Sequence, residues 1–75
     1  MVDKDWFVRE IEDKCGSMRN FATRMDMDVS AVSRMLSDRR KIQLAEAASM
    51  SIILGVPIEE IMARAGLMVQ KRRSR

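Results

Sequence analysis

The sequence has few of the residues that cross-link small proteins. Its 75 residues include one cysteine, Cys15, and no histidine. A single cysteine excludes a disulfide within the chain, and the absence of histidine removes a common ligand of zinc. A chain of this length is near the lower limit for one apolar core, so we expect a single domain that depends on packing alone, in a reducing compartment.

Residues suited to catalysis and to base stacking are also scarce. Tyrosine is absent, and the three aromatic residues are one tryptophan and two phenylalanines. The acids near the start of the chain have no histidine, tyrosine or second cysteine to act with them, and no glycine-rich loop is present to hold a phosphate. We therefore expect neither an enzyme nor a cofactor nor a small-molecule ligand. A surface that stacks single-stranded bases is not expected either.

Long hydrophobic runs are missing. No apolar stretch approaches the roughly 18 residues of a membrane span. The first residues, MVDKDWF, carry two acids where a secretory signal has cations and then an apolar run. We expect a cytoplasmic protein that does not enter a membrane. Apolar residues make up 47% of the chain and charged residues 33%, which is typical of a globular domain rather than of a disordered chain.

The three glycines and the single proline lie where helices are expected to end or begin. Gly16, Gly55 and Gly66 each follow an apolar periodic segment, and Pro57 suits the first turn of a helix. No segment alternates apolar and polar residues for long enough to predict a strand. The sequence predicts an all-α protein with five helices, over residues 3–15 (or 5–15), 17–25, 28–37, 43–54 and 57–65.

Apolar residues recur at spacings of three and four along each predicted helix, which places them on one face. The predicted core comprises Phe7, Ile11, Cys15, Met18, Phe21, Ala22, Met25, Val32, Met35, Leu44, Ala47, Ala48, Ser51, Leu54, Ile58, Ile61 and Met62. Ile52 and Ile53 are adjacent, and one helical face cannot bury both together with Leu54. At least one of the two isoleucines is therefore expected to be exposed.

The net charge of +3 is unevenly distributed along the chain. When lysine and arginine are counted against aspartate and glutamate, the sums are −2 for residues 1–16, +3 for 17–43, −2 for 44–66 and +4 for 67–75. One interpretation is that these blocks are solvated faces of the domain. The other is that the basic segments bind a polyanion, which requires them to share one face.

Residues 20–41, NFATRMDMDVSAVSRMLSDRRK, contain the end of one short predicted helix and the whole of the next. Only Asp26 and Met27 separate the two helices, too few residues for antiparallel packing, so the helices must turn sharply against each other. A close crossing needs a small residue where they pack, which Ala22 provides. Met27 and the β-branched Val32 supply apolar contacts. This spacing is typical of a helix-turn-helix.

The chain here resembles the helix-turn-helix domains of the Cro and cI-type (Xre-like) repressors. The resemblance covers residues 7–66 and rests on Phe21-Ala22, Met25, Met27, Val32-Ser33-Arg34-Met35 and the later segment LGVPIEEIM. It implies a five-helix lambda-repressor-like DNA-binding domain over residues 1–66. Residues 67–75 have no second apolar face, and we expect them to form a basic, mobile tail.

Three positions depart from the pattern of that family. The chain has Asp26 and Asp38 where the family commonly has glycine, and Leu36 where it commonly has glutamate. Aspartate is among the few residues that tolerate a positive φ. We therefore expect the turn at Asp26 to form at some energetic cost.

The resemblance assigns base contacts in the major groove to four residues: Val29, Ser30, Ser33 and Arg34. On a helix that begins after Asp28, the last three point away from the predicted core residues Val32 and Met35. Arg34 is suited to a bidentate pair with guanine, Ser30 to one hydrogen bond, and Val29 to a thymine methyl group. The alternative for Arg34 is a solvated helix cation.

Phosphate contacts are expected from Ser17, Arg19, Asn20, Arg39, Arg40 and Lys41. The first three begin the second predicted helix, whose free N–H groups attract a phosphate. The last three are consecutive cations that follow the third helix. For Arg19, exposure to solvent alone is the alternative. The tail cations Lys71, Arg72, Arg73 and Arg75 are expected to matter less, because ordering the tail costs entropy.

The predicted function is sequence-specific binding of double-stranded DNA by a transcriptional regulator, typical of a Cro-like phage, prophage or bacterial repressor. The alternative is a protein-binding module, an antitoxin or accessory protein, that binds DNA only secondarily. Non-specific DNA binding is a third interpretation. Because one such domain makes few base contacts, we expect a weak homodimer consolidated on a two-fold operator. The predicted dimer contact comprises Ile52, Ile53, Met62, Leu67, Met68 and Val69, unless these residues only cover the end of the core.

Overall fold

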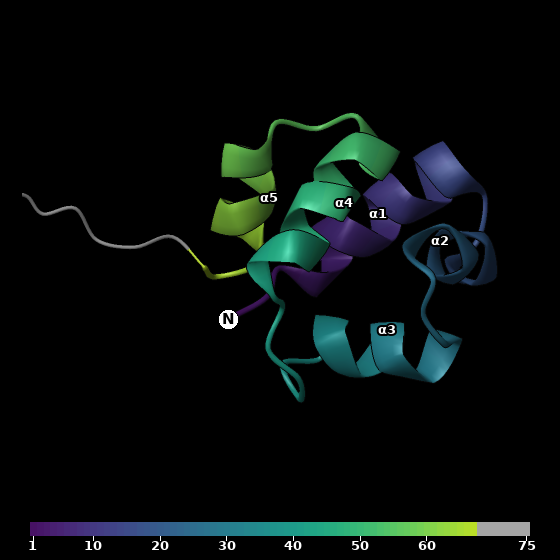
Figure 1. Cartoon of the computed structure of the whole chain (residues 1–75), viewed down its shortest axis with the longest axis horizontal. Coiled ribbons are helices and arrows are strands. Elements are labelled where there is room, and N and C mark those ends of the chain that lie inside the picture. The colour runs from purple at the N-terminus through teal and green to yellow at the C-terminus, as the bar shows by residue number, and fades with distance from the viewer. Residues whose placement is uncertain (68–75) are drawn as a thin grey trace, which may run out of the picture.

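Five α-helices make up most of residues 1–67, the part of the chain that the computed structural model describes (Figure 1). They are α1 (Lys4–Cys15), α2 (Met18–Met25), α3 (Val29–Leu36), α4 (Leu44–Leu54) and α5 (Ile58–Arg64). No strand occurs in these 67 residues. The all-helical prediction is confirmed for this part of the chain, and each helix lies within a residue or two of its predicted bounds.

Side chains at the starts of the helices accept hydrogen bonds from backbone N–H groups that have no backbone partner there. The Asp3 carboxylate accepts a hydrogen bond from the backbone N–H of Trp6, and the Ser17 hydroxyl accepts one from that of Asn20. Before α4, the Gln43 N–H donates to the carboxylate of Glu46 at 2.9 Å. Local sequence therefore determines where these helices begin.

A residue with positive φ follows each of the five helices within two residues of its end. Three are the glycines for which the sequence predicts this role, at positions 16, 55 and 66. The fourth is Asp26, with φ 59° and ψ 45° in the left-handed region, as expected for a residue in the place of a glycine. Asp38, in the loop after α3, also has a positive φ of 64°.

One apolar core joins all five helices. It comprises Phe7, Ile11, Cys15, Phe21, Ala22, Val32, Met35, Leu36, Ile42, Ala47, Met50, Leu54, Ile61 and Ala65, and in residues 1–67 no polar or charged residue is buried. Partly buried residues, including Met18, Met25 and Met62, pack against it. The core face was therefore predicted correctly for most of the helices.

Leu44 is the main error in the predicted core, because its side chain is 64% exposed. The buried face of α4 is formed by Ala47, Met50 and Leu54, and Leu44 lies about a quarter of a turn away from its centre. Apolar residues lie all round α4, so spacing alone does not show which of them face the core. Met50, which is fully buried, was not predicted.

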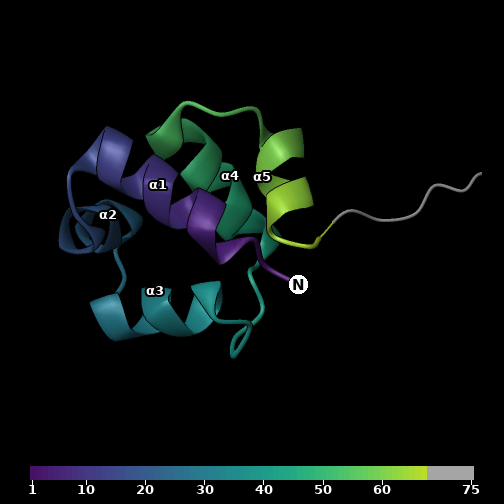
Figure 2. The same ribbon diagram turned by 180° about the vertical axis from the view of Figure 1, so that it is seen from behind.

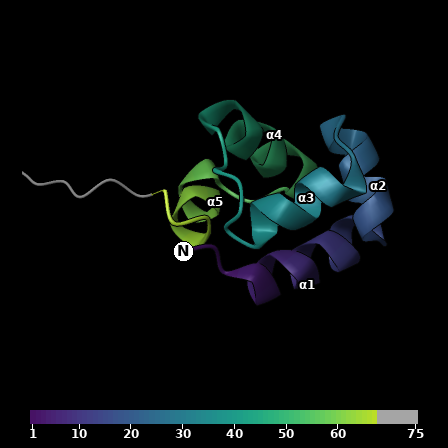
Figure 3. The ribbon, with the colours of Figure 1, turned by 90° about the horizontal axis from the view of Figure 1, so that it is seen from below.

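The helices surround the core in a consistent arrangement. α4 packs against α1, α2 and α5, and α2 also packs against α1 and α3. Figures 1 and 2 show α3 along one edge of the molecule, and Figure 3 shows it between α1 and α4. One side of α3 therefore packs on the core while the other side remains free.

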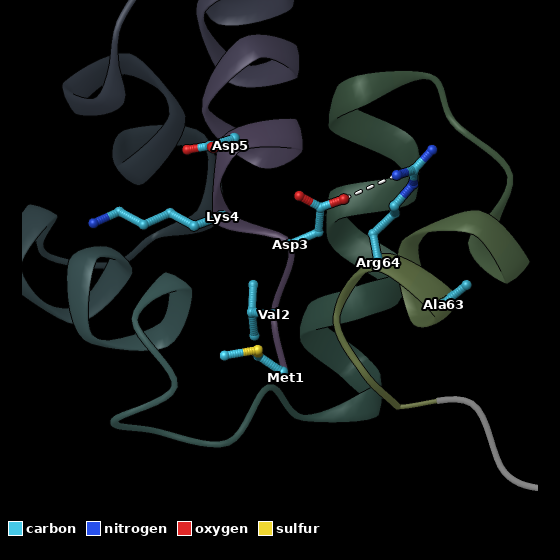
Figure 4. Close-up of a pocket in the computed structure, with 7 residues that line it drawn as sticks. All are labelled: Met1, Val2, Asp3, Lys4, Asp5, Ala63 and Arg64. Atoms are coloured by element: carbon cyan, nitrogen blue, oxygen red, sulfur yellow. Dashed lines mark hydrogen bonds and ion pairs between the residues drawn. The ribbon is translucent and has the colours of Figure 1, made fainter.

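The first residues of the chain connect α5 to the loop after α3. Asp3 donates its N–H to the Arg64 carbonyl at 2.7 Å, and its carboxylate pairs with the Arg64 guanidinium at 2.9 Å (Figure 4). The Val2 N–H lies 3.1 Å from both carboxylate oxygens of Asp38. The residues before α1 thereby link α5 to the loop after α3, although these elements are far apart in the sequence.

Candidate nucleic-acid interface

The turn between α2 and α3 spans three residues, Asp26 to Asp28. The Met27 N–H donates to the Ala22 carbonyl at 2.9 Å, which continues the last turn of α2 through the left-handed Asp26. Ala22 is buried, as expected for the small residue at the crossing. In Figure 1, α2 is seen nearly end-on and α3 from the side, so the chain changes direction sharply at this turn.

α3 has one buried face and one exposed face. Val32, Met35 and Leu36 are buried. Among the four predicted base-contacting residues, Val29 is 41% exposed, and Ser30, Ser33 and Arg34 are all exposed. The structure therefore presents these four residues to solvent from one short helix, and three of them carry polar side chains that can hydrogen-bond to a ligand.

The residues at the start of α2 are largely engaged in capping. The Asn20 amide donates to the Cys15 carbonyl at 3.0 Å, while the Ser17 hydroxyl accepts from the Asn20 N–H at 3.1 Å. The hydroxyl can still donate a hydrogen bond. Arg19 is exposed and forms no ion pair within residues 1–67. Of the three predicted phosphate contacts here, Arg19 therefore has the least constrained side chain.

The three consecutive cations after α3 differ in whether they pair with an acid. Arg39 and Lys41 are exposed, and neither pairs with an acid in the described residues. Arg40 instead donates from both terminal nitrogens to Glu46, at 3.1 and 2.6 Å. Its hydrogen bonds lower the pKa of the Glu46 carboxyl, and Glu46 in turn raises the pKa of Arg40. Arg40 is thus already held by an acid of α4.

Two acids lie near the start of α3 and oppose the positive charge of the neighbouring segments. Asp26 and Asp28 are exposed and line a surface hollow together with Thr23, Ala31 and Arg40. Their negative charge opposes the approach of a phosphate at that point. Arg39 and Lys41, which follow the other end of α3, are exposed and pair with no acid in residues 1–67, so positive charge without a partner lies after the C-terminal end of the helix.

The predicted dimer residues have different surroundings. Ile53, Met62 and Leu67 are partly buried and pack against the core. Ile52 is 82% exposed, which satisfies the expectation that at least one of the adjacent isoleucines is exposed. Met68 and Val69 lie outside the described residues, as do the tail cations.

A pocket also lies away from α2 and α3, at the start of the chain. The pocket in Figure 4 is lined by Met1–Asp5, Ala63 and Arg64, and its Asp3 and Arg64 already pair with each other. No group of three or more possible metal-ligating side chains occurs in the described region. No helix there is both long enough and apolar enough to cross a membrane.

Neither the protein-family models, nor the curated proteins, nor the solved structures contain a match to the chain.

Proposed function

We propose that the chain is a sequence-specific, double-stranded DNA-binding transcriptional regulator in which α2 and α3 form a helix-turn-helix. One observation carries the proposal: α3 buries Val32, Met35 and Leu36 and exposes Ser30, Ser33 and Arg34. A helix with a polar, hydrogen-bonding outer face and unpaired cations after its last turn is suited to the major groove.

In this proposal α3 lies in the major groove and its exposed side chains contact base edges. Arg34 forms a bidentate pair with guanine, Ser30 forms one hydrogen bond, and Val29 contacts a thymine methyl group. Ser33 lies on the same face and adds a second hydroxyl. These contacts provide sequence preference, because each depends on the groups that a particular base pair presents.

Phosphate contacts position the protein on the duplex. Arg39 and Lys41 follow α3 and carry charges that no acid of the described region neutralises. At the start of α2, Arg19 and the Ser17 hydroxyl reach a second phosphate. Binding is therefore expected to weaken as salt rises, since each neutralised phosphate releases counterions.

We further propose that occupancy of the operator is the regulatory act, as in a Cro-like phage, prophage or bacterial repressor that works in the cytoplasm without a cofactor. The second candidate function is a protein-binding module of the antitoxin or accessory type. The exposure of Leu44 and Ile52 on α4 favours it, because two large apolar side chains on one helix are then available to a protein partner. The two functions are compatible if both surfaces are used.

Selection of duplexes from a random pool tests the proposed function. We expect repeated rounds at moderate salt to enrich one short motif. Arg34→Ala should then lose about 1 to 3 kcal/mol of binding free energy on the selected duplex and little on random duplex, because only the base-specific contact disappears. Fluorescence anisotropy with both duplexes measures this difference.

Arg9→Ala is the matched control, since Arg9 is an exposed arginine of α1 outside the proposed interface. It should change binding to both duplexes equally and slightly. Failure to enrich any motif would contradict sequence-specific recognition. Equal losses for Arg34→Ala on both duplexes would assign Arg34 to the phosphate contacts instead.

A further inference from the structure

The loop after α3 begins with a residue whose backbone is strained. Asp38 has a positive φ of 64°, and the Arg39 N–H donates across it to the Arg34 carbonyl at 2.9 Å. This hydrogen bond closes α3 in a way that normally uses glycine, because a residue with a side chain is strained in the left-handed region. An aspartate here is therefore expected to form a contact that glycine cannot form.

The Asp38 carboxylate forms such a contact with the segment before α1. Both of its oxygens lie 3.1 Å from the Val2 nitrogen, whose N–H donates to them. Val2 packs against the core. The next residue, Asp3, is bound to Arg64 by its N–H at 2.7 Å and by its carboxylate at 2.9 Å. The donor is thus held by α5, so the hydrogen bond attaches Asp38 to a fixed point.

Asp26 shows that the left-handed conformation alone does not produce this contact. Asp26 has a similar φ of 59° at the end of α2. In residues 1–67, however, its carboxylate accepts no hydrogen bond. The contact with Val2 therefore depends on where Asp38 lies in the tertiary structure.

Packing alone does not hold the loop on the side of Val2. A hollow of about 260 Å³ separates the loop from the segment before α1, and Val2, Asp38 and Lys41 are among the residues that line it. Ile42, at the far end of the loop, is buried in the core. Nearer α3, the hydrogen bond between Val2 and Asp38 joins the two sides of the hollow. It therefore supplies an attachment where apolar contact is incomplete.

We propose that Asp38 is a positioning residue for the phosphate contacts of Arg39 and Lys41, and that it acts through Val2. This role rests on the proposed DNA-binding function and deepens it. Both cations are exposed and pair with no acid in the described residues. A loop that is already fixed in the free protein loses less conformational entropy when its cations meet phosphates.

Two substitutions at residue 38 separate the effect of its side-chain oxygen from those of its backbone and charge. Asp38→Asn and Asp38→Gly both remove the negative charge, and both new residues tolerate a positive φ. Only asparagine keeps an oxygen that accepts from the Val2 N–H. Amide hydrogen exchange followed by NMR, without DNA, measures the protection of that N–H. We expect protection at Val2 to be about three- to tenfold lower in Asp38→Gly than in Asp38→Asn.

The same two substitutions at Asp26 are the matched control. The Met27 N–H donates to the Ala22 carbonyl at 2.9 Å across Asp26, as the Arg39 N–H does to its own acceptor across Asp38. Asp26→Gly and Asp26→Asn should differ by less than about twofold in the protection of Met27, because neither loses a side-chain hydrogen bond. Protection of Arg39 should differ about three- to tenfold between the two variants at residue 38. Circular dichroism checks that the four variants fold.

Fluorescence anisotropy with random duplex measures the consequence for binding. We expect the dissociation constant of Asp38→Gly to be about three- to tenfold higher than that of Asp38→Asn, because the freed loop must be ordered as it binds. The slope of log binding constant against log salt should be equal for the two, since the number of phosphates contacted is unchanged. When Arg39→Ala and Lys41→Ala are also present, both variants should bind within about twofold of each other, because the loop then has no free cation to position.

Equal protection of Val2 and Arg39 in the two variants at residue 38 would overturn the proposal. So would unequal protection with equal dissociation constants, because the attachment would then have no effect on phosphate contacts. A difference in binding that survives the removal of both cations would also overturn it and would assign the effect to overall stability. An unmodified chain that binds no duplex would overturn the proposed function and the role of Asp38 in it, while the exchange measurements would still show separately whether Asp38 holds the loop.

Discussion

At the scale of single residues, the three consecutive cations after α3 differ in whether an acid of the protein already neutralises their charge. Arg40 lies in the middle of the run, yet its terminal nitrogens both donate to Glu46. Arg39 and Lys41 on either side are exposed and pair with no acid in residues 1–67. Sequence alone treats the three cations as equivalent, whereas the structure predicts that they contribute differently to the proposed DNA binding.

If the loop contacts phosphates, Arg39→Ala and Lys41→Ala should each reduce the slope of log binding constant against log salt by about 0.9. Arg40→Ala should reduce it less, because Glu46 already neutralises that guanidinium. Binding to random duplex at several salt concentrations gives the slopes. An effect of Arg40→Ala as large as that of Arg39→Ala would mean that DNA displaces Glu46. Unaltered slopes in all three variants would show that these cations are merely solvated.

The ion pair between Arg40 and Glu46 also predicts a dependence of stability on pH. The hydrogen bond from Arg40 lowers the folded-state pKa of Glu46 below its ordinary value of 4.5. A depressed carboxyl pKa stabilises the fold above that ordinary value, and the stabilisation is lost as pH falls through the folded-state pKa. Glu46→Gln removes the charge but keeps an oxygen that accepts from the Gln43 N–H.

We expect Glu46→Gln to lower the free energy of unfolding by about 0.5 to 1 kcal/mol at pH 7, in the range of partly exposed ion pairs. Below pH 4.5 the unmodified and variant chains should converge. Urea unfolding at a series of pH values measures the difference. A difference that stays constant down to the most acidic pH would show that the effect of Glu46 is not its charge.

At the scale of elements, the turn between α2 and α3 depends on a backbone conformation that most residues avoid. Asp26 has φ 59° and ψ 45° in the left-handed region, whereas Asp28 has an extended φ of −74° and ψ of 150°. The Asp28 side chain forms no capping hydrogen bond. Two identical residues in one turn therefore have very different conformational requirements.

This contrast predicts that Asp26→Ala destabilises the fold by about 1 kcal/mol more than Asp28→Ala, since a residue with a Cβ and no local hydrogen bond is strained in the left-handed region. Asp26→Gly should be at least as stable as the unmodified chain. Urea unfolding followed by circular dichroism compares the three variants. Equal losses for the two alanine variants would show that the turn does not depend on the conformation of residue 26.

At the scale of the whole molecule, the chain start is held between elements that come much later. Val2 donates to Asp38 beyond α3, and Asp3 pairs with Arg64 at the end of α5. Gly66 lies against this segment, because a Cβ on it would be 2.5 Å from the Met1 nitrogen and 2.9 Å from the Met1 carbonyl oxygen. Gly55, which ends α4, has a similar positive φ but no atom within 4 Å of the same position.

The two glycines therefore form a matched pair for measuring how tightly the chain start is docked. Gly55→Ala should lose about 1 kcal/mol for the left-handed conformation alone. Gly66→Ala should lose more, because the backbone of Met1 must also move away. Thermal and urea unfolding of both variants give the comparison. Equal losses would mean that the segment before α1 contributes little to stability.

Much of this fold follows from short-range features of the sequence. Capping residues such as Ser17, closing residues such as Gly55 and apolar spacing of three and four act within one or two turns of a helix. The helix bounds, the left-handed Asp26 and the exposed face of α3 were therefore predictable. In α3, the polar residues Ser30, Ser33 and Arg34 differ in character from the core residues, so the two faces are distinct in sequence.

Long-range packing decided the features that sequence did not reveal. Because apolar residues surround α4, only the neighbouring helices determine that Met50 is buried while Leu44 is exposed. The partner of Val2 is Asp38, 36 residues away, and the partner of Asp3 is Arg64 at the end of α5. Such pairings depend on where segments that are far apart in sequence come to lie, and no local pattern of charge or hydrophobicity encodes that position.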